Sequence, residues 1–268
     1  MNALAQEGAR LLGATLAGSR SLGGGSLSQL MSIDLEDGRS VIVKGGPSPE
    51  AEAAMLEAIA ASGAPAPHVL GVSETAFVME IMPEGGHLSS AWASVGAAVR
   101  TLHAATGKRY GWNCDFAFGA VEIRNDWSED WPRFWSENRL LNTCPHVPGP
   151  MARRLERLSK TIADRLPARP KASLLHGDLW SGNVLVSGSE ISALIDPACY
   201  YGHSEVDLAM LHLFGSPSDT FYAAYGELEP GHEERRAIYT LWPVLVHLRL
   251  FGSGYRGHTE RLLDQLSV

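Results

Sequence analysis

The sequence has little cysteine and no long uninterrupted apolar segment. It contains three cysteines in 268 residues, and none of them belongs to a CxxC pair. A low, odd number of scattered thiols argues against a disulfide framework and favours a reducing compartment. The strongest apolar run, YTLWPVLVHLRLF, contains a proline, a histidine and an arginine and is too short to cross a bilayer. We therefore expect a cytoplasmic protein that does not bind a membrane.

Positive charge is also scarce. Lysine and arginine number 22 against 30 aspartates and glutamates, so the formal net charge is -8. Such a surface repels a phosphate backbone, and nucleic acid is therefore not an expected partner. A chain of this length is long enough for one large domain or for two lobes with a cleft between them. The sequence leaves the oligomeric state open, with a monomer slightly favoured.

Residues 1–83 are predicted to form a small β-rich lobe. After an amphipathic N-terminal helix, polar and apolar side chains alternate over residues 30–35. The Asp-Gly pair at 37–38 then predicts a hairpin turn, because this pair between two β-rich runs is a strong hairpin signal. Lys44 lies at the far end of the second strand, and the helix that follows carries Glu52 in its first turn.

The stretch PEGGH at 83–87 has the composition of a linker and is the candidate boundary between two lobes. Residues 84–268 are expected to be mostly helical, because apolar residues recur there at helical spacing. Strands return only within residues 173–197, where two apolar runs flank the turn SGSE. The predicted fold class is α+β, with an antiparallel N-terminal lobe that has one main helix and a larger, mostly helical C-terminal lobe.

Three polar residues near this second β-rich stretch could carry chemistry. Asp178 and Asn183 bracket a loop in HGDLWSGNVLV, and Asp196 ends the strand SALID. A hairpin between them would bring Asn183 close to Asp196, and hard oxygen ligands of this kind suit Mg²⁺. The spacing is that of a phosphotransferase catalytic loop, in which the Asp orients and deprotonates a hydroxyl while the Asn and a later Asp hold the metal. Each residue alone is more often part of a turn or a cap.

The N-terminal lobe supplies residues that suit a nucleotide. Gly23, Gly24 and Gly25 would let the backbone approach phosphates closely. Lys44 could pair with the α- and β-phosphates, with Glu52 holding it in place. A glycine triplet is more often a flexible turn, and a lone lysine at a strand end is usually a solvated charge. Their order along the chain, followed by the loop described above, favours ATP-dependent phosphoryl transfer.

Several segments resemble the fructosamine kinase (ketosamine kinase) family, within the wider aminoglycoside-phosphotransferase and protein-kinase-like superfamily. They are HGDLWSGNVLV, LIDPACYYGHSEVDLAM, GGGSLSQ with VIVKGG, and NDWSEDWPRFWSENRL. The resemblance covers roughly residues 4–265, and Trp180 with the paired tyrosines distinguishes the loop from that of other HGD....N enzymes. It implies a two-lobed protein-kinase-like fold and a kinase that uses ATP and Mg²⁺ to phosphorylate a ketosamine, a fructosamine or ribulosamine, at O3. Release of the amine would follow, which is a deglycation activity.

The resemblance also implies roles for individual residues. Asp178 would be the catalytic base, a task that needs no unusual pKa, and Asn183 and Asp196 would hold the metal. Lys44 and Glu52 would position the nucleotide. Further nucleotide contacts are implied in the glycine loop and in the backbone of VMEIM, at Gly23, Gly24, Gly25, Ser26, Glu80 and Met82.

Other residues are expected to support the loop or to meet the substrate. Glu205 and Asp207 would brace the catalytic loop from the helix that follows, and His176 would hold loop backbone without transferring a proton. Aromatic faces commonly pack on sugars, so Trp180 and Trp127 are candidate substrate contacts, with core packing as the alternative for each.

The sequence departs from the family pattern in two places, and both bear on regulation or specificity. Ser26 stands where many relatives have cysteine, so regulation through a thiol is not expected there. The segment AVEIRND replaces the family's usual run before Asn125, where the acceptor may be approached. An acidic protein with an acid-lined acceptor site would favour a cationic amine as substrate.

Three other interpretations remain open. A phosphotransferase of the same fold could act on an aminoglycoside, choline-like or other hydroxylated amine. A metal-dependent hydrolase could use His176, Asp178, Asp196 and His203, but it would leave the glycine loop and Lys44 without a role. A non-catalytic nucleotide-binding relative would be expected to lack one of the four key residues, and all four are present.

Overall fold

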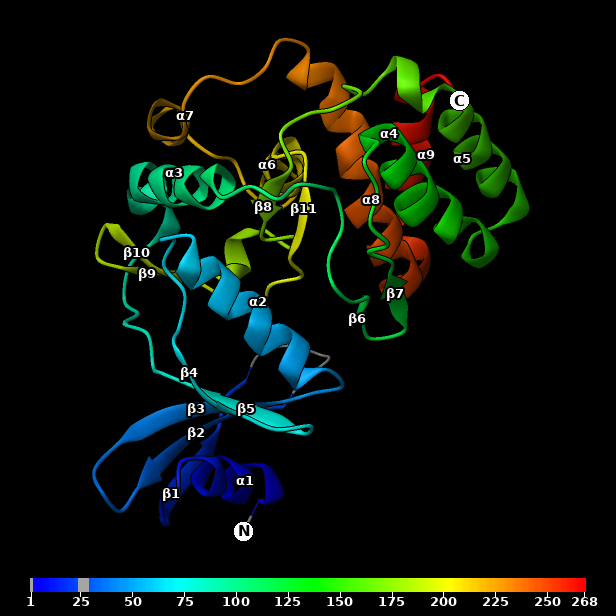
Figure 1. Cartoon of the computed structure of the whole chain (residues 1–268). Helices are drawn as coiled ribbons and strands as arrows, with labels where there is room; N and C mark the ends of the chain where they lie inside the picture. The colour runs from blue at the N-terminus through cyan, green and yellow to red at the C-terminus, as the bar shows by residue number, and fades with distance from the viewer. Residues whose placement is uncertain (1, 24–28) are drawn as a thin grey trace.

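A five-stranded antiparallel sheet forms the N-terminal part of the protein in the computed structural model, which describes residues 2–23 and 29–268 (Figure 1). The strand order is β1-β2-β3-β5-β4. The elements of this part are α1 (Ala3–Leu11), β1 (Leu16–Ser21), β2 (Gln29–Leu35), β3 (Ser40–Gly45), α2 (Pro49–Ala61), β4 (Val69–Val72) and β5 (Ala76–Met79).

The central hairpin follows from the sequence pattern. Met31, Ile33 and Leu35 of β2 point into the core, whereas the intervening residues are partly or fully exposed. The turn at Gly38 has a φ of +88°, a conformation that glycine adopts without strain. The predicted hairpin is therefore confirmed, and its register sets Lys44 opposite Leu30 on one side and Phe77 on the other.

Helices α1 and α2 cover the two faces of the sheet (Figure 1). Helix α1 approaches β3 so closely that a Cβ on Gly8 would overlap the Val43 side chain. Helix α2 packs through Met55, Leu56 and Ile59 in an apolar cluster that continues into the C-terminal part of the chain. The sheet and its glutamate-bearing helix therefore form one body around Lys44.

The remainder of the chain is mostly helical. Its elements are α3 (Leu88–Ala104), β6 (Phe116–Phe118), β7 (Val121–Ile123), α4 (Trp131–Trp135), a π-helical turn (Ser136–Leu140), α5 (Gly149–Thr161), β8 (Ser173–Leu175), β9 (Val184–Ser187), β10 (Glu190–Leu194), β11 (Tyr200–Gly202), α6 (Glu205–Leu213), α7 (Asp219–Tyr225), α8 (His232–Phe251) and α9 (Arg256–Gln265). The predicted α+β fold class is confirmed.

Several short strands were not predicted from the sequence. The β6–β7 hairpin lies within residues expected to be helical, and β4 and β11 were also not predicted. Strands of three or four residues are too short to show a period of two, and tertiary contacts decide their pairing. The hairpin predicted around SGSE is present as β9 and β10.

The apolar cluster on α2 extends across the predicted lobe boundary. It joins α2 to Val95 and Val99 of α3 and to Leu174 beside the catalytic loop. The boundary between residues 83 and 84 stays a prediction. Within the described residues, no helix combines the length and the apolar character needed to span a membrane.

We predict that Gly96→Ala destabilises the protein. A Cβ on Gly96 of α3 would overlap the Phe221 carbonyl of α7. The free energy of unfolding should fall by about 1–3 kcal/mol, the usual cost of overpacking. Alanine in an unconstrained helix would instead raise it by roughly 0.5–1 kcal/mol.

Chemical denaturation measures this effect, and Gly254→Ala is the matched control. Gly254 has no neighbouring atom within 4 Å of the position of an added Cβ, so its replacement should change stability by less than about 0.5 kcal/mol. A Gly96→Ala protein as stable as the control would show that the contact between α3 and α7 is not a constraint.

Candidate active site

Lys44 lies at the junction between the sheet and the helical part. Its ammonium donates hydrogen bonds to Glu52 of α2 and, over 2.7 Å, to Oδ1 of Asp196. Burial of the lysine favours its neutral form, but the two carboxylates outweigh this, and the pKa of Lys44 is raised. For Glu52, by contrast, burial is the main effect, and it raises the pKa of the carboxyl group. The charged lysine therefore ties a strand, a helix and the Asp196 loop together.

The loop that carries Asp178 is held by a buried carboxylate. Asp207 of α6 accepts hydrogen bonds from the backbone N–H groups of His176, at 2.7 Å, and Gly177, at 3.0 Å. Its other buried neighbour is His103 of α3, whose Nε2 lies 3.1 Å away. Gly177 has a φ of +80°, and a Cβ there would overlap the Ala198 carbonyl. These contacts leave the loop one conformation.

His176 holds this loop from within. Its Nε2–H donates to the Ile195 carbonyl over 2.9 Å, so Nδ1 is left to accept the Asp178 backbone N–H at 3.3 Å. Burial lowers the pKa of the imidazole and keeps it neutral. Both ring nitrogens are engaged, and this arrangement suits a structural role.

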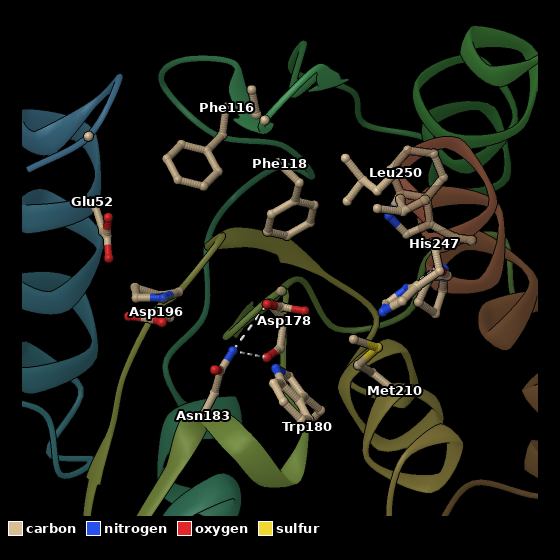
Figure 2. Close-up of a pocket in the computed structure, with 18 of the residues that line it drawn as sticks. Glu52, Phe116, Phe118, Asp178, Trp180, Asn183, Asp196, Met210, His247 and Leu250 are labelled. Atoms are coloured by element: carbon tan, nitrogen blue, oxygen red, sulfur yellow. Dashed lines mark hydrogen bonds between the residues drawn. The ribbon is translucent and has the colours of Figure 1, made fainter. Parts of the chain in front are cut away.

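The β9–β10 hairpin brings the remaining polar residues together. The backbone N–H of Ile195 donates to the Asn183 carbonyl over 3.0 Å, which sets Asp196 beside the loop. The Asn183 amide donates to the carbonyl and to Oδ2 of Asp178, at 2.9 and 3.1 Å (Figure 2). Asp196 has a φ of +54°, a strained conformation that Asp tolerates better than most residues and that is common at functional sites.

The pKa of Asp178 is raised to about 7, although the proposed task needs no unusual value. Burial is the main cause, and the negative charges of Asp196 and Asp207 add to it, while the hydrogen bond from Asn183 opposes it. A carboxyl group with this pKa exchanges protons near neutral pH, which suits a general base but is not a condition for phosphoryl transfer.

Asn183 and Asp196 offer oxygen ligands of the kind that Mg²⁺ prefers. The Asn183 amide nitrogen is turned towards Asp178, so its Oδ1 is the atom left for a cation. The Asp196 side chain is 45% exposed, which leaves it accessible from the pocket. The donor chemistry therefore fits a hard divalent cation.

These side chains open onto one pocket with a volume of about 510 Å³. It contains Lys44, Glu52, Asp178, Asn183 and Asp196 together with Trp180. The structure adds residues that the sequence analysis missed: Gly46, Pro47 and Ser48 beside Lys44, the β6–β7 hairpin, and the inner face of α8. No sequence motif marks that face, because its apolar residues are typical of any core helix.

Several predicted nucleotide contacts are not placed in this pocket. Gly24, Gly25 and Ser26 lie outside the described residues, and Gly23 is exposed at the end of the preceding segment. Glu80 accepts a hydrogen bond from the His68 backbone through its carboxylate, and it does not line the pocket. Met82 does not line it either. Their roles stay predictions.

The two candidate substrate tryptophans differ in position. Trp180 lines the pocket, and its ring packs edge-on against Phe214 at 6.1 Å between centroids. Trp127 does not line it. Its ring stacks on Tyr201, and the guanidinium of Arg109 lies over the Trp127 ring, 5.2 Å from the ring centroid.

Two further residues lie elsewhere than expected. Glu205, expected to brace the catalytic loop, is bonded instead to Arg235 of α8 through a 2.7 Å contact from Nε. His203, part of the hydrolase interpretation, is buried against Tyr239 and does not line the pocket. Burial lowers the pKa of His203 to about 3. The metal-hydrolase arrangement is therefore not assembled.

The chain is similar to known proteins over most of its length. A family model described as fructosamine kinase matches residues 2–268. A probable ketoamine kinase from Synechocystis sp. is 35% identical to this chain, over a match that covers 81% of this chain and 77% of that relative. The chloroplastic protein-ribulosamine 3-kinase of Arabidopsis thaliana is 34% identical over 91% of this chain and 81% of that protein.

Solved structures show the same fold. A Thermobifida fusca protein assigned as a fructosamine-3-kinase superposes with a TM-score of 0.90 at 29% identity, covering 99% of this chain and 98% of that one. The macrolide 2'-phosphotransferase of Brachybacterium faecium shares the fold at 17% identity, with a TM-score of 0.64 over 98% of both chains.

We predict that Asp178→Asn stabilises the protein when nucleotide and divalent cations are absent. Because folding raises the pKa of Asp178 from about 3.8 to about 7, ionising this carboxylate costs stability. The cost grows as the pH rises through this window and is constant above it. At pH 7.5 the variant should gain about 1–3 kcal/mol, a range that allows for the partial exposure of the side chain.

Denaturation curves between pH 4 and pH 8 in the presence of a chelator measure this gain. The exposed Asp164→Asn is the control, and its stability should follow that of the unchanged protein at every pH within about 0.5 kcal/mol. If the stability of Asp178→Asn also follows that of the unchanged protein at every pH, folding does not raise the pKa of Asp178.

Proposed function

The chain belongs to the fructosamine kinase family, and we propose that it transfers the γ-phosphoryl group of ATP to a sugar hydroxyl of a ketosamine. The observation that carries the proposal is the convergence of Asp178, Asn183, Asp196 and the Lys44–Glu52 pair on one pocket. The first three come from the helical part, Lys44 comes from strand β3 of the sheet, and Glu52 comes from helix α2, which packs on that sheet, as a kinase cleft requires.

Each residue has a role in this reaction. Asp178 orients the attacking hydroxyl and accepts its proton as the new P–O bond forms. Lys44 neutralises charge on the phosphates of ATP, and Glu52 keeps the lysine extended towards them. Because positioning and charge neutralisation supply most of the catalysis in phosphoryl transfer, a rigid loop matters more than an exceptional base.

A divalent cation, Mg²⁺ in our proposal, would be held by Asn183 Oδ1 and the Asp196 carboxylate. When bound, it would offset the negative charge of the phosphates. The Lys44 ammonium already contacts Asp196, so the two groups that neutralise the phosphates are adjacent.

The acceptor hydroxyl in our proposal is O3 of a fructosamine or ribulosamine. A relative in Arabidopsis is named a protein-ribulosamine 3-kinase. A phosphate at O3 is a good leaving group two carbons from the amine-bearing carbon, so the product would lose its amine more readily than the substrate. The activity would then be deglycation, and we place it in the cytoplasm.

An acceptor screen tests the proposal. Fructosyl and ribulosyl amines, an aminoglycoside and choline would each be incubated with ATP, Mg²⁺ and the purified protein, and the phosphorylated products identified by mass spectrometry. We expect phosphorylation of the ketosamines. Phosphorylation of the aminoglycoside or of choline with no ketosamine product would overturn the assignment in favour of the alternative acceptor class.

We predict that Asp178→Ala lowers kcat by at least roughly 10²–10⁴-fold, the usual contribution of a positioned base, while ATP binding stays nearly intact. The carboxylate contacts the hydroxyl rather than the nucleotide. Single-turnover phosphoryl transfer and calorimetric ATP titration separate the two effects. Robust turnover by this variant would remove Asp178 from the chemistry.

Lys44→Ala should act on the nucleotide instead. Without the ammonium, the phosphates of ATP and the Glu52 and Asp196 carboxylates repel one another, so we expect the KM for ATP to rise by roughly tenfold or more. The exposed Lys108→Ala serves as the control and should leave this KM within a factor of two. An unchanged KM for ATP in the Lys44 variant would contradict the assignment of Lys44 to the phosphates.

A further inference from the structure

The pocket continues beyond Asp178 into a part lined by apolar side chains. We call this part the apolar region. It is built from the β6–β7 hairpin, α6 and the inner face of α8, and its main residues are Phe116, Phe118, Met210, Val246, Leu250 and Phe251. In Figure 2, Glu52 and Asp196 lie at one side of the pocket and His247 and Leu250 at the other, with Asp178 and Phe118 between them.

Charge is distributed unevenly along the pocket. Among the described residues that line it, the charged side chains are Lys44, Glu52 and Asp196 on the nucleotide side and Asp178 at the centre. The expected acid lining of the acceptor site is therefore limited to these positions, and the part of the pocket beyond Asp178 has no charged side chain among the described residues that line it. The neighbouring cation on α8, Arg249, is not among the lining residues.

The polar groups of the apolar region are few and uncharged. His247 Nδ1–H donates to the Pro243 carbonyl over 2.7 Å, and burial lowers the pKa of the ring, so it is neutral near pH 7. The ring packs against Phe214, Phe251 and Tyr255 with centroids 4.8, 5.4 and 5.0 Å away. The result is an aromatic surface with no charged side chain among the described residues that line it.

Part of this surface is open to solvent. Phe251 is 57% exposed although it lines the pocket, and Trp180, which also lines it, is 38% exposed. Large exposed apolar side chains that converge on a functional cleft are typical of ligand contacts, because an apolar ligand removes them from water.

We propose that the apolar region binds the amine substituent of the ketosamine, and that the preferred substrates are glycated amines that carry an uncharged alkyl or aryl group. This inference rests on the proposed function. It adds the chemical class of the amine, which neither the family nor the catalytic residues specify.

Substrate connectivity leads to this assignment. In a ketosamine the amine nitrogen is on C1 and the acceptor hydroxyl on C3, so both lie near Asp178 when O3 is positioned for transfer. The nucleotide fills the side of Lys44 and Glu52. The substituent on nitrogen must therefore extend into the remaining space, which is the apolar region.

The same geometry disfavours charged substituents. The α-ammonium and α-carboxylate of free glycated lysine would leave water and find no ionic partner among the lining residues, a costly transfer. An uncharged ring or alkyl chain gains by leaving water, and one methylene in an enzyme pocket changes kcat/KM by roughly 10–200-fold.

The test compares three acceptors with the same sugar. They are the fructosyl derivatives of methylamine, of benzylamine and of 4-(aminomethyl)benzoate, which differ only in the substituent on nitrogen. We expect kcat/KM for the benzyl compound to exceed that for the methyl compound by about tenfold or more, whereas the benzoate should lose most of this gain.

Two variants locate the preference in the apolar region. In Phe251→Ser and, separately, in Leu250→Asn, the benzyl-to-methyl ratio of kcat/KM should fall by at least about fivefold. Because Phe251 is largely exposed, its replacement should not unfold the protein. Leu141→Ser is the control, since Leu141 is 37% exposed and does not line the pocket, and it should keep the ratio.

Each outcome decides between the two proposals. If all three fructosyl amines are phosphorylated at similar efficiency, or the benzoate is best, the apolar assignment is overturned and the kinase function stands. If the ratio survives both variants, the preference does not arise in the apolar region. If no fructosyl or ribulosyl amine is phosphorylated, the proposed function fails and this inference fails with it.

Discussion

The buried carboxylate of Asp207 is the constraint on which the catalytic loop depends. It is fully shielded from solvent, so its charge must be offset by donors, and two of these are successive backbone N–H groups of the loop. The loop cannot move without leaving this charge unpaired. Its fixed course places Asp178 in the middle of the pocket, and Asn183 and Asp196 line the same space.

Lys44 plays the matching part on the opposite side. Its ammonium is paired with a carboxylate from α2 and one from the Asp196 loop, so it connects the sheet with the helical part of the chain. Several charged side chains therefore lie close together at this end of the pocket, and the positive charge of Lys44 is paired with two negative ones. The pKa of Asp178 is nevertheless raised, because burial of the carboxyl group and the neighbouring acids outweigh the opposing effects of Asn183 and Lys44. Ionising Asp178 therefore lowers the free energy of unfolding, while the raised pKa lets this carboxyl group exchange protons near neutral pH.

The opposite end of the pocket follows a different principle. Helix α8 and the β6–β7 hairpin supply apolar and aromatic side chains and no charged group among the lining residues. In the proposed reaction, one end would recognise phosphates and a cation through charge, and the other would offer dispersion and apolar burial. The segment AVEIRND, which departs from the family pattern, contains β7 of this hairpin. Strand β7 pairs with β6, which carries Phe116 and Phe118 of the apolar region, but none of residues 120–126 is among the described residues that line the pocket.

The reaction class and the α+β fold could be predicted from the order of the residues alone. The spacing of Asp178, Asn183 and Asp196, and the order of Lys44 and Glu52 before them, are local patterns that a chain shows without being folded. Folding, by contrast, sets Asp207 against the loop and pairs Glu205 with Arg235, although both acidic residues lie in the first turn of α6. Folding also stacks Trp127 on Tyr201 and brings α8 to the wall of the pocket. The reason is physical: an apolar helix face has the same sequence pattern whether it packs in a core or forms the wall of a pocket, and only contacts between distant residues distinguish the two.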